Sequence, residues 1–244
     1  MPEESQPQPP AAPAGAANRP SRSGNFRSSV AQFLAALVLM LFVAPFVDEI
    51  EYGPAIDTVL ITLVLILGVL AVGRSRRTLV LALVLMVPAV VTKWVGNFQP
   101  HLLPLASLTA LVFIGFVEFQ LLHFIFRAPR VNSEVLCAGI SGYLLLGILW
   151  MVSYMLVSRL DSDAAHPAFI GTASAHSLSQ FEAYYFSFIT LSTVGYGDIT
   201  PLSHPARTLA MMEAMTGTLY MAVLISRLVA LYSSQAPEPP EPKK

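Results

Sequence analysis

The feature that most constrains this chain is a series of long apolar segments separated by mostly short polar spacers. A helix that crosses the hydrocarbon core of a bilayer, roughly 30 Å thick, needs about 20 residues. Six segments are close to or above this length: residues 30–47, 54–72, 78–95, 102–126, 133–158 and 206–232. We therefore expect an all-α membrane protein with six transmembrane helices.

The composition excludes several other classes of protein. Hydrophobic residues make up 55% of the chain and charged residues only 12%, whereas soluble proteins carry about 25% charged residues. The net charge of −1 predicts no nucleic-acid partner, and the single cysteine, Cys137, excludes an intrachain disulfide. The sequence contains no nucleotide-binding loop and no nucleophile–base pair, so we expect neither an enzyme nor a cofactor.

The distribution of basic residues predicts the orientation in the membrane. Arginines gather before the first apolar segment and in alternate spacers after it: Arg19, Arg22 and Arg27, then Arg74, Arg76 and Arg77, then Arg127 and Arg130. Basic loops face the cytoplasm. We therefore expect a multi-pass protein of the cell (inner) membrane with both termini in the cytoplasm.

The two ends of the chain have a composition that favours disorder. Residues 1–29 and 233–244 are rich in proline and small or polar residues and contain no apolar run. We expect both to be disordered cytoplasmic tails. The second is too short to be a cytoplasmic ligand-binding domain.

The long loop between the fifth and sixth segments, residues 159–205, predicts a helix that enters the membrane without crossing it. Its part at residues 177–192 is too short and too polar to span, yet apolar enough to be a re-entrant helix. Ser177 or Ser179 would be the N-cap, and Glu182 would lie in the first turn, where the helix dipole favours a negative charge.

The residues that follow, TVGYGD at positions 193–198, predict a cation path. Irregular backbone is tolerated inside a membrane only where it lines an aqueous path. Gly195 and Gly197 adopt positive φ without steric cost, so successive carbonyl groups can face one axis and replace the water around a cation. Asp198 would place a negative charge at the outer mouth, and the preceding helix would direct its negative end toward the cation.

This TVGYGD segment resembles the selectivity filter of potassium channels, and the resemblance extends over about residues 133–232. It implies K⁺ as the permeant ion and no other metal. Since a ring of filter carbonyls needs four loops and the chain has one, the resemblance implies a homotetramer in the lipid bilayer. The K⁺-coordinating residues would be Thr193, Val194, Gly195, Tyr196 and Gly197.

The resemblance also divides the chain into two domains. Residues 131–232 would form the pore domain, with an outer helix, a pore helix, the filter and an inner helix. Residues 30–130 match only the number and topology of the voltage-sensor-like domain of six-helix prokaryotic channels. The fourth segment contains no Arg or Lys, and only Arg127 and Arg130 follow its inner end. We therefore expect passive K⁺ conduction with weak or no voltage gating.

Further residues have roles that the resemblance suggests. Tyr185 and Phe186 would support the filter, with Tyr185 bonded to Asp198. Gly217, 20 residues after Gly197, would be a gating hinge of the inner helix, or else a site of close helix packing. An ionisable residue inside a membrane is a functional candidate. Glu213 would therefore be a cavity-lining acid, a support behind the filter or a structural hydrogen-bonding group.

Some alternatives stay open from the sequence. Glu118 and His123 would be satisfied structurally within the bundle, or would pair with each other, contact Asp57 or respond to pH. An active K⁺ transporter subunit is a second candidate function, although such proteins carry four degenerate filter loops per chain. A third candidate is a membrane sensor whose first four helices bind a small ligand.

Overall fold

The computed structural model describes residues 22–47, 52–73, 75–160, 168–171 and 178–233. These residues form long helices, as the apolar segments predict. The helices are α1 (Arg22–Val47), α2 (Gly53–Val72), α3 (Arg76–Gly96), α4 (Leu103–Arg127), α5 (Ser133–Leu160), α6 (Gln180–Leu191) and α7 (His204–Ser233). A short 3₁₀ turn, η1 (Pro100–Leu102), precedes α4, and two short strands, β1 (Phe169–Ile170) and β2 (Thr200–Pro201), flank α6 in the sequence.

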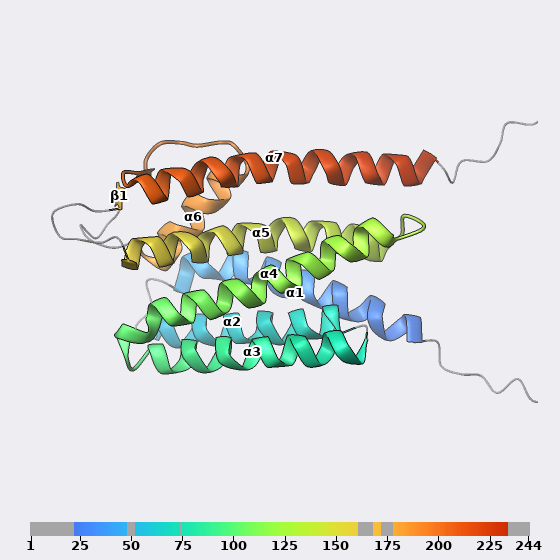
Figure 1. The fold of residues 1–244 in the computed structure, drawn as a ribbon, viewed down its shortest axis with the longest axis horizontal. Helices are drawn as coiled ribbons and strands as arrows, with labels where there is room; N and C mark the ends of the chain where they lie inside the picture. Colours follow the sequence, from blue (N-terminus) through green and yellow to red (C-terminus); the bar gives the residue numbers. More distant parts are fainter. Residues whose placement is uncertain (1–21, 48–51, 74, 161–167, 172–177, 234–244) are drawn as a thin grey trace, which may run out of the picture.

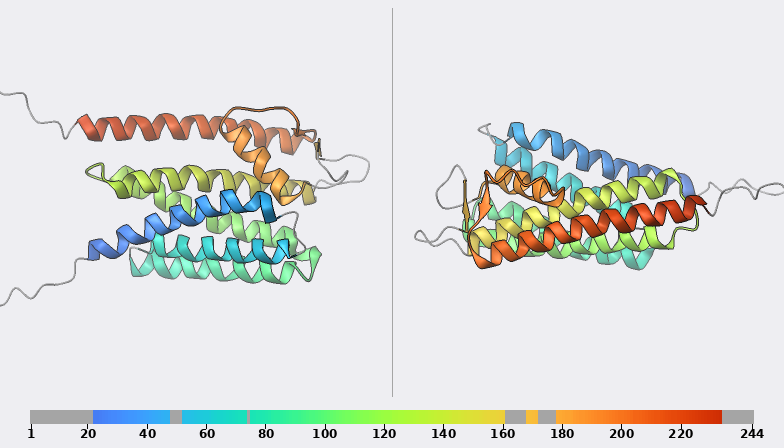
Figure 2. Two further views of the ribbon diagram at one scale, coloured as in Figure 1. Left: turned by 180° about the vertical axis from the view of Figure 1, so that it is seen from behind. Right: turned by 90° about the horizontal axis from the view of Figure 1, so that it is seen from above.

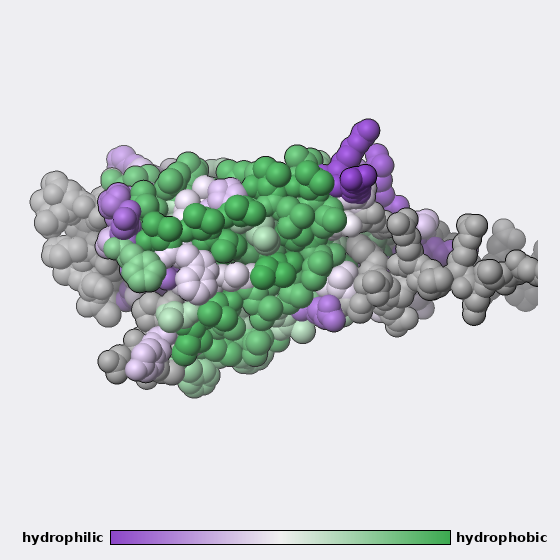
Figure 3. Space-filling model, turned by 90° about the horizontal axis from the view of Figure 1, so that it is seen from below, coloured by the Kyte–Doolittle hydropathy of each residue, from purple (hydrophilic) through white to green (hydrophobic). Residues whose placement is uncertain are grey.

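Five of the helices, α2, α3, α4, α5 and α7, are long and apolar enough to cross a membrane. The first helix contains a shorter apolar stretch, Ser29–Val43, so the count of six crossings stays a prediction. In Figure 1, α1 begins and α7 ends at the same end of the bundle, as an even number of crossings requires. Figure 3 shows the apolar surface over the middle of the bundle, with hydrophilic residues toward its ends.

The start of α1 corrects one boundary. The sequence places residues 22–29 in a disordered tail, but the helix begins at Arg22. The segment contains no proline, so it can continue the apolar helix backward by about two turns. The rest of the two expected tails, residues 1–21 and 234–244, lies outside the described residues.

The helices form two halves that meet at α5 (Figure 1). We call α1–α4 the peripheral half and α5–α7, which hold the predicted pore segments, the pore half. One side of α5 contacts α1 and α4, and another side contacts α6 and α7. Only residues 128–132 connect α4 to α5, and this short connection keeps the peripheral half beside the pore half of its own chain.

The short helix α6 is inclined to the long helices (Figure 2) and contacts both α5 and α7. It begins near the end of the bundle opposite the start of α1 and runs inward (Figure 1). Its re-entrant position in a bilayer stays a prediction. The strands β1 and β2 pair antiparallel, with Phe169 opposite Pro201 and Ile170 opposite Thr200, and so connect the segments before and after α6.

Candidate functional site

The start of α6 is set by a reciprocal capping box. The Ser179 Oγ accepts a hydrogen bond from the backbone N–H of Glu182 (3.1 Å), and the Glu182 carboxylate accepts one from the backbone N–H of Ser179 (2.7 Å). The N-cap is therefore Ser179, whereas Ser177 lies outside the described residues. Such a cap typically contributes about 1 kcal/mol to helix stability. It fixes where α6 begins and hence where the TVGYGD segment follows.

The backbone after α6 alternates in conformation. Thr193, Gly195 and Gly197 have φ values of 60°, 52° and 81°, whereas Val194 and Tyr196 between them do not have positive φ. The positive values at both glycines confirm the expectation from sequence. The value at Thr193 was not foreseen, because a β-branched residue in the left-handed region costs about 1–2 kcal/mol.

The end of this segment at Asp198 is held by a side-chain hydrogen bond. The Tyr185 Oη donates to the Asp198 Oδ2 at 2.6 Å, which confirms the predicted contact. The bond lowers the pKa of Asp198 below its usual value of 3.8 and raises the pKa of Tyr185 to about 12. Phe186 lies elsewhere on α6, where its ring packs edge-on against Tyr154 (4.9 Å between centroids) and Phe169 (5.5 Å).

A second contact at Asp198 was missed by the sequence reasoning. Gly171 follows β1 and has a φ of 89°, and a β-carbon added to it would lie 1.9 Å from the backbone oxygen of Asp198. Only glycine permits this approach. The signal in the sequence was a lone glycine in a long loop, which does not indicate its partner.

Glu213 on α7 is fully buried. Its Oε2 accepts a hydrogen bond from the Tyr154 Oη at 2.5 Å, and its Oε1 lies 2.6 Å from the Ser187 Oγ. The carboxyl group therefore joins α7 to α5 and α6. This burial fits a structural or supporting group and does not fit an acid that lines an aqueous cavity.

The Ser187 hydroxyl has two acceptors within reach. Its Oγ is 2.7 Å from the backbone oxygen of Gly147, which can only accept, and 2.6 Å from the Glu213 Oε1. A hydroxyl group has one hydrogen. It is either shared between both acceptors, or it is donated to Gly147 while a protonated Glu213 donates to Ser187. We expect the second arrangement, with an uncharged Glu213, because a buried carboxylate without a cation is costly.

Two glycines allow α6 to pack closely between its neighbours. A β-carbon added to Gly217 would lie 2.5 Å from the backbone oxygen of Leu191, and one added to Gly147 would lie 2.6 Å from the ring of Phe188. The helix α7 continues through Gly217 without a break. The packing interpretation of Gly217 therefore has direct structural support, and its role as a gating hinge stays a prediction.

The predicted pairing of Glu118, His123 and Asp57 is wrong. Both carboxylate oxygens of Glu118 are buried without a hydrogen-bond partner among the described residues. The ring of His123 stacks on Phe119. Asp57 instead pairs with Lys93, at 3.2 Å from its Nζ, and accepts a hydrogen bond from Gln180. The sequence could not show the contact between Asp57 and Gln180, because these residues are 123 positions apart.

The comparisons with known proteins indicate a family for part of the chain. Residues 143–234 match the sequence model of a family described as "Ion channel". Protein LctB of Bacillus caldotenax is 32% identical over 101 residues, which are 41% of this chain and 74% of that protein. The described part of the chain also has five helices of spanning length, so the protein is a multi-pass membrane protein.

Two potassium channels are also similar over parts of their length. Inward rectifier potassium channel Kirbac3.1 of Paramagnetospirillum magnetotacticum is 29% identical over 104 residues, 42% of this chain and 32% of that channel. Two-pore potassium channel 4 of Arabidopsis thaliana is 41% identical over 49 residues, 20% of this chain and 17% of that channel. The match thus covers less than a third of either potassium channel. The chain belongs to the ion-channel family, and its relatives there include potassium channels.

Proposed function

We propose that four copies of this chain surround one axis and form a pore that conducts K⁺ passively across the plasma membrane. The observation that carries this proposal is the alternation of positive φ at Thr193, Gly195 and Gly197 with other conformations at Val194 and Tyr196. Such alternation allows successive carbonyl oxygens to face the same side. Four of these segments would provide rings of oxygens that replace the hydration shell of K⁺.

The electrostatics of the surrounding residues support a cation as the permeant ion. The C-terminal end of α6, at Leu191, immediately precedes the filter and carries the partial negative charge of the helix dipole. Asp198 stays ionised at neutral pH because its pKa is below the usual value. A cation entering the proposed pore would therefore pass a carboxylate first and a helix C-terminus later.

The surface of α7 supports assembly around an axis. Several large apolar side chains on this helix are exposed in the single chain: Met211, Met215, Leu219, Val223 and Val229. In the proposed homotetramer, neighbouring copies of α7 cover part of this surface, and the remainder lines the inner pore. One chain supplies one filter segment, so a closed ring requires four chains.

The peripheral half supports weak or absent voltage gating. Moving one charge across 100 mV is worth about 2.3 kcal/mol, and steep sensors move about 3–4 charges per subunit. The helix α4 contains no lysine and a single arginine, Arg127, at its last position. Lys93 on α3 is paired with Asp57. We therefore propose an open probability that changes little with voltage.

The test is planar-bilayer recording of the purified full chain with high K⁺ and low Na⁺ on one side and low K⁺ and high Na⁺ on the other. We expect currents that reverse near the K⁺ equilibrium potential and a nearly linear current–voltage curve in symmetric K⁺. A reversal potential near zero would refute K⁺ selectivity. A steep sigmoidal activation would refute the assignment of the peripheral half as voltage-insensitive.

A further inference from the structure

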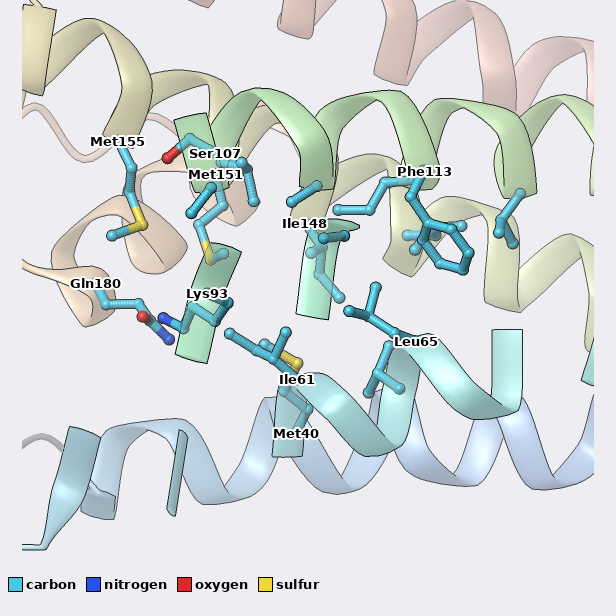
Figure 4. Close-up of a pocket in the computed structure, with 18 of the residues that line it drawn as sticks. Met40, Ile61, Leu65, Lys93, Ser107, Phe113, Ile148, Met151, Met155 and Gln180 are labelled. Carbon is cyan, nitrogen blue, oxygen red and sulfur yellow. The ribbon is translucent and has the colours of Figure 1, made fainter. Parts of the chain in front are cut away.

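A polar contact joins the peripheral half to the start of α6. Asp57 lies near the start of α2, and its two carboxylate oxygens have different partners. The Oδ1 accepts a hydrogen bond from the Gln180 side chain, and the Oδ2 lies 3.2 Å from the Lys93 Nζ. The polar ends of Gln180 and Lys93 lie side by side in Figure 4. One carboxylate therefore connects helices α2, α3 and α6.

This carboxylate belongs to a pair of helices that further polar contacts hold together. Next to Asp57, the Thr58 Oγ1 accepts a hydrogen bond from the side chain of Asn97, at the C-cap of α3, at 2.9 Å. One turn further along α2, the Thr62 Oγ1 accepts a hydrogen bond from the Trp94 Nε1 at 3.2 Å. These bonds and the ion pair fix the register of α2 against α3. A displacement of the helix pair therefore moves the Asp57 carboxylate with it.

The donor of the contact lies at the capped start of α6. Gln180 is the first residue of this helix and directly follows the N-cap Ser179, where the reciprocal capping box satisfies backbone groups of the first turn. The whole helix has 12 residues, which corresponds to a length of about 18 Å. We expect so short a helix with a closed first turn to move as one body. A displacement of Gln180 is then transmitted to the other end of α6.

The proposed filter is attached to α6 at both of its ends. At one end, the backbone N–H of Thr193 donates to the carbonyl oxygen of Thr190, in the last turn of α6, at 2.9 Å. At the other end, Asp198 accepts the hydrogen bond from Tyr185, which lies in the middle of α6. The position of α6 therefore sets the backbone geometry of the segment between these two attachments.

We propose that Asp57 is a positioning residue through which the peripheral half regulates the pore. By holding Gln180, it fixes the start of α6 relative to α2 and α3. A displacement of that helix pair shifts α6 and changes the geometry of the filter segment that α6 holds. This inference rests on the proposed function, because it assigns a regulatory contact to the same filter. It also gives the peripheral half a role that requires no gating charges.

The test is single-channel recording of the purified full chain in planar bilayers with symmetric K⁺. The measured quantity is the ratio of conducting to non-conducting time. Asp57→Leu removes the acceptor of Gln180, and the loss of a hydrogen bond to a charged group changes an equilibrium by about tenfold. We expect the ratio to fall by about that factor. Asp57→Asn loses the ion pair with Lys93 but keeps an oxygen that can accept from Gln180, so it should retain most of the parent ratio.

A double-mutant cycle and a matched control separate this role from general destabilisation. Gln180→Leu should lower the ratio as Asp57→Leu does, and both substitutions together should lower it no further than either alone. Because Gln180 is only partly buried, its variant supplies the test if Asp57→Leu does not fold.

The control changes a hydrogen bond inside the peripheral half. Thr92→Val removes the bond of 2.8 Å between Thr92 and Thr109, which joins α3 to α4 without reaching α6. It should leave the ratio of conducting to non-conducting time unchanged. An unchanged ratio in Gln180→Leu, additive effects in the double variant, or an equal loss in Thr92→Val would overturn the proposal.

Hydrogen exchange of the backbone separates this inference from the proposed function, because it requires no current. Asp57→Leu and Gln180→Leu should both increase exchange in residues 189–198, which include the N–H groups bonded to the last turn of α6. Thr92→Val should not. If the parent conducts no K⁺ but these increases appear, the proposed function fails and the positioning role of Asp57 stands. If the parent conducts K⁺ and neither variant changes this exchange, the positioning role fails and the proposed function stands.

Discussion

The buried carboxyl groups of the pore half and of the peripheral half have different surroundings. In the pore half, Glu213 is fully buried, and each of its oxygens has a named partner, Tyr154 or Ser187. In the peripheral half, Glu118 is nearly as buried, and neither of its oxygens has a hydrogen-bond partner among the described residues. One pair of glycines shows a similar contrast, because Gly217 touches the backbone of α6 whereas nothing lies within 4 Å of a β-carbon added to Gly115 on α4.

The difference shows what each half has to hold in place. Directional hydrogen bonds and backbone contacts depend on tenths of an ångström, so they can fix the position of α6 and the backbone after it. Apolar packing of helices tolerates substitutions that conserve volume. We therefore expect the same kind of substitution to have a larger effect in the pore half than in the peripheral half.

The largest difference is expected between two glycine substitutions. Gly195→Ala places a β-carbon on a residue with a φ of 52° inside the proposed filter, where the four segments would meet. K⁺ flux in liposomes should fall to background while the tetramer still assembles. Gly115→Ala in α4 should leave flux unchanged and raise the free energy of unfolding by about 0.5–1 kcal/mol. Unchanged K⁺ selectivity in Gly195→Ala would remove the filter assignment.

Gly217→Ala distinguishes close packing from a hinge. Because the new methyl group would overlap the backbone oxygen of Leu191, we expect α6 to shift and the protein to lose about 1–3 kcal/mol of stability. Unit conductance or selectivity should change, and single-channel recording measures both. If the only effect is a lower open probability, Gly217 acts as a hinge.

A matched pair of acid substitutions compares the buried carboxyl groups. Glu213→Leu leaves the Tyr154 hydroxyl without its acceptor, which should cost about 1–3 kcal/mol. Glu118→Leu removes a buried polar group that has no partner among the described residues, so stability should be unchanged or higher. Thermal unfolding in detergent measures both. A larger loss of stability in Glu118→Leu than in Glu213→Leu would contradict the comparison between the halves.

The protonation of Glu213 has a separate spectroscopic test. Infrared difference spectra between the parent and Glu213→Gln should show the carbonyl band of a protonated carboxylic acid at neutral pH. The amide of glutamine can accept from Tyr154 and donate to Ser187, so this variant should retain K⁺ flux. A carboxylate band in its place would contradict the proton assignment.

The smallest effect is expected at the Asp198 end of the proposed filter. The Tyr185 hydrogen bond lowers the pKa of Asp198. The contribution of this bond to stability is therefore present above the usual carboxyl pKa, and it is lost as the pH falls through the lowered value. On the alkaline side it is lost only as the pH rises through the Tyr185 pKa of about 12. Tyr185→Phe should move the acid limb of the flux–pH profile to higher pH. An unmoved acid limb would show that this contact does not influence conduction.

The sequence by itself determined the features that depend on local chemistry. Apolar runs of spanning length predict the helices at 54–72, 78–95, 102–126 and 133–158, because a bilayer leaves a long apolar segment little alternative to a helix. Positive φ at Gly195 and Gly197 was predictable because glycine carries no β-carbon. The contact between Tyr185 and Asp198 followed from the family resemblance and the short distance along the chain.

The tertiary structure decided the contacts between residues far apart in sequence. Tyr154 and Glu213 are 59 residues apart, and Asp57 and Gln180 are 123 apart, so no periodicity or motif could pair them. Whether Gly217 meets a neighbour also depends on the position of Leu191 on another helix. The physical reason is that local preferences act within a few residues, whereas burial and hydrogen-bond partners are set by how whole helices pack against one another.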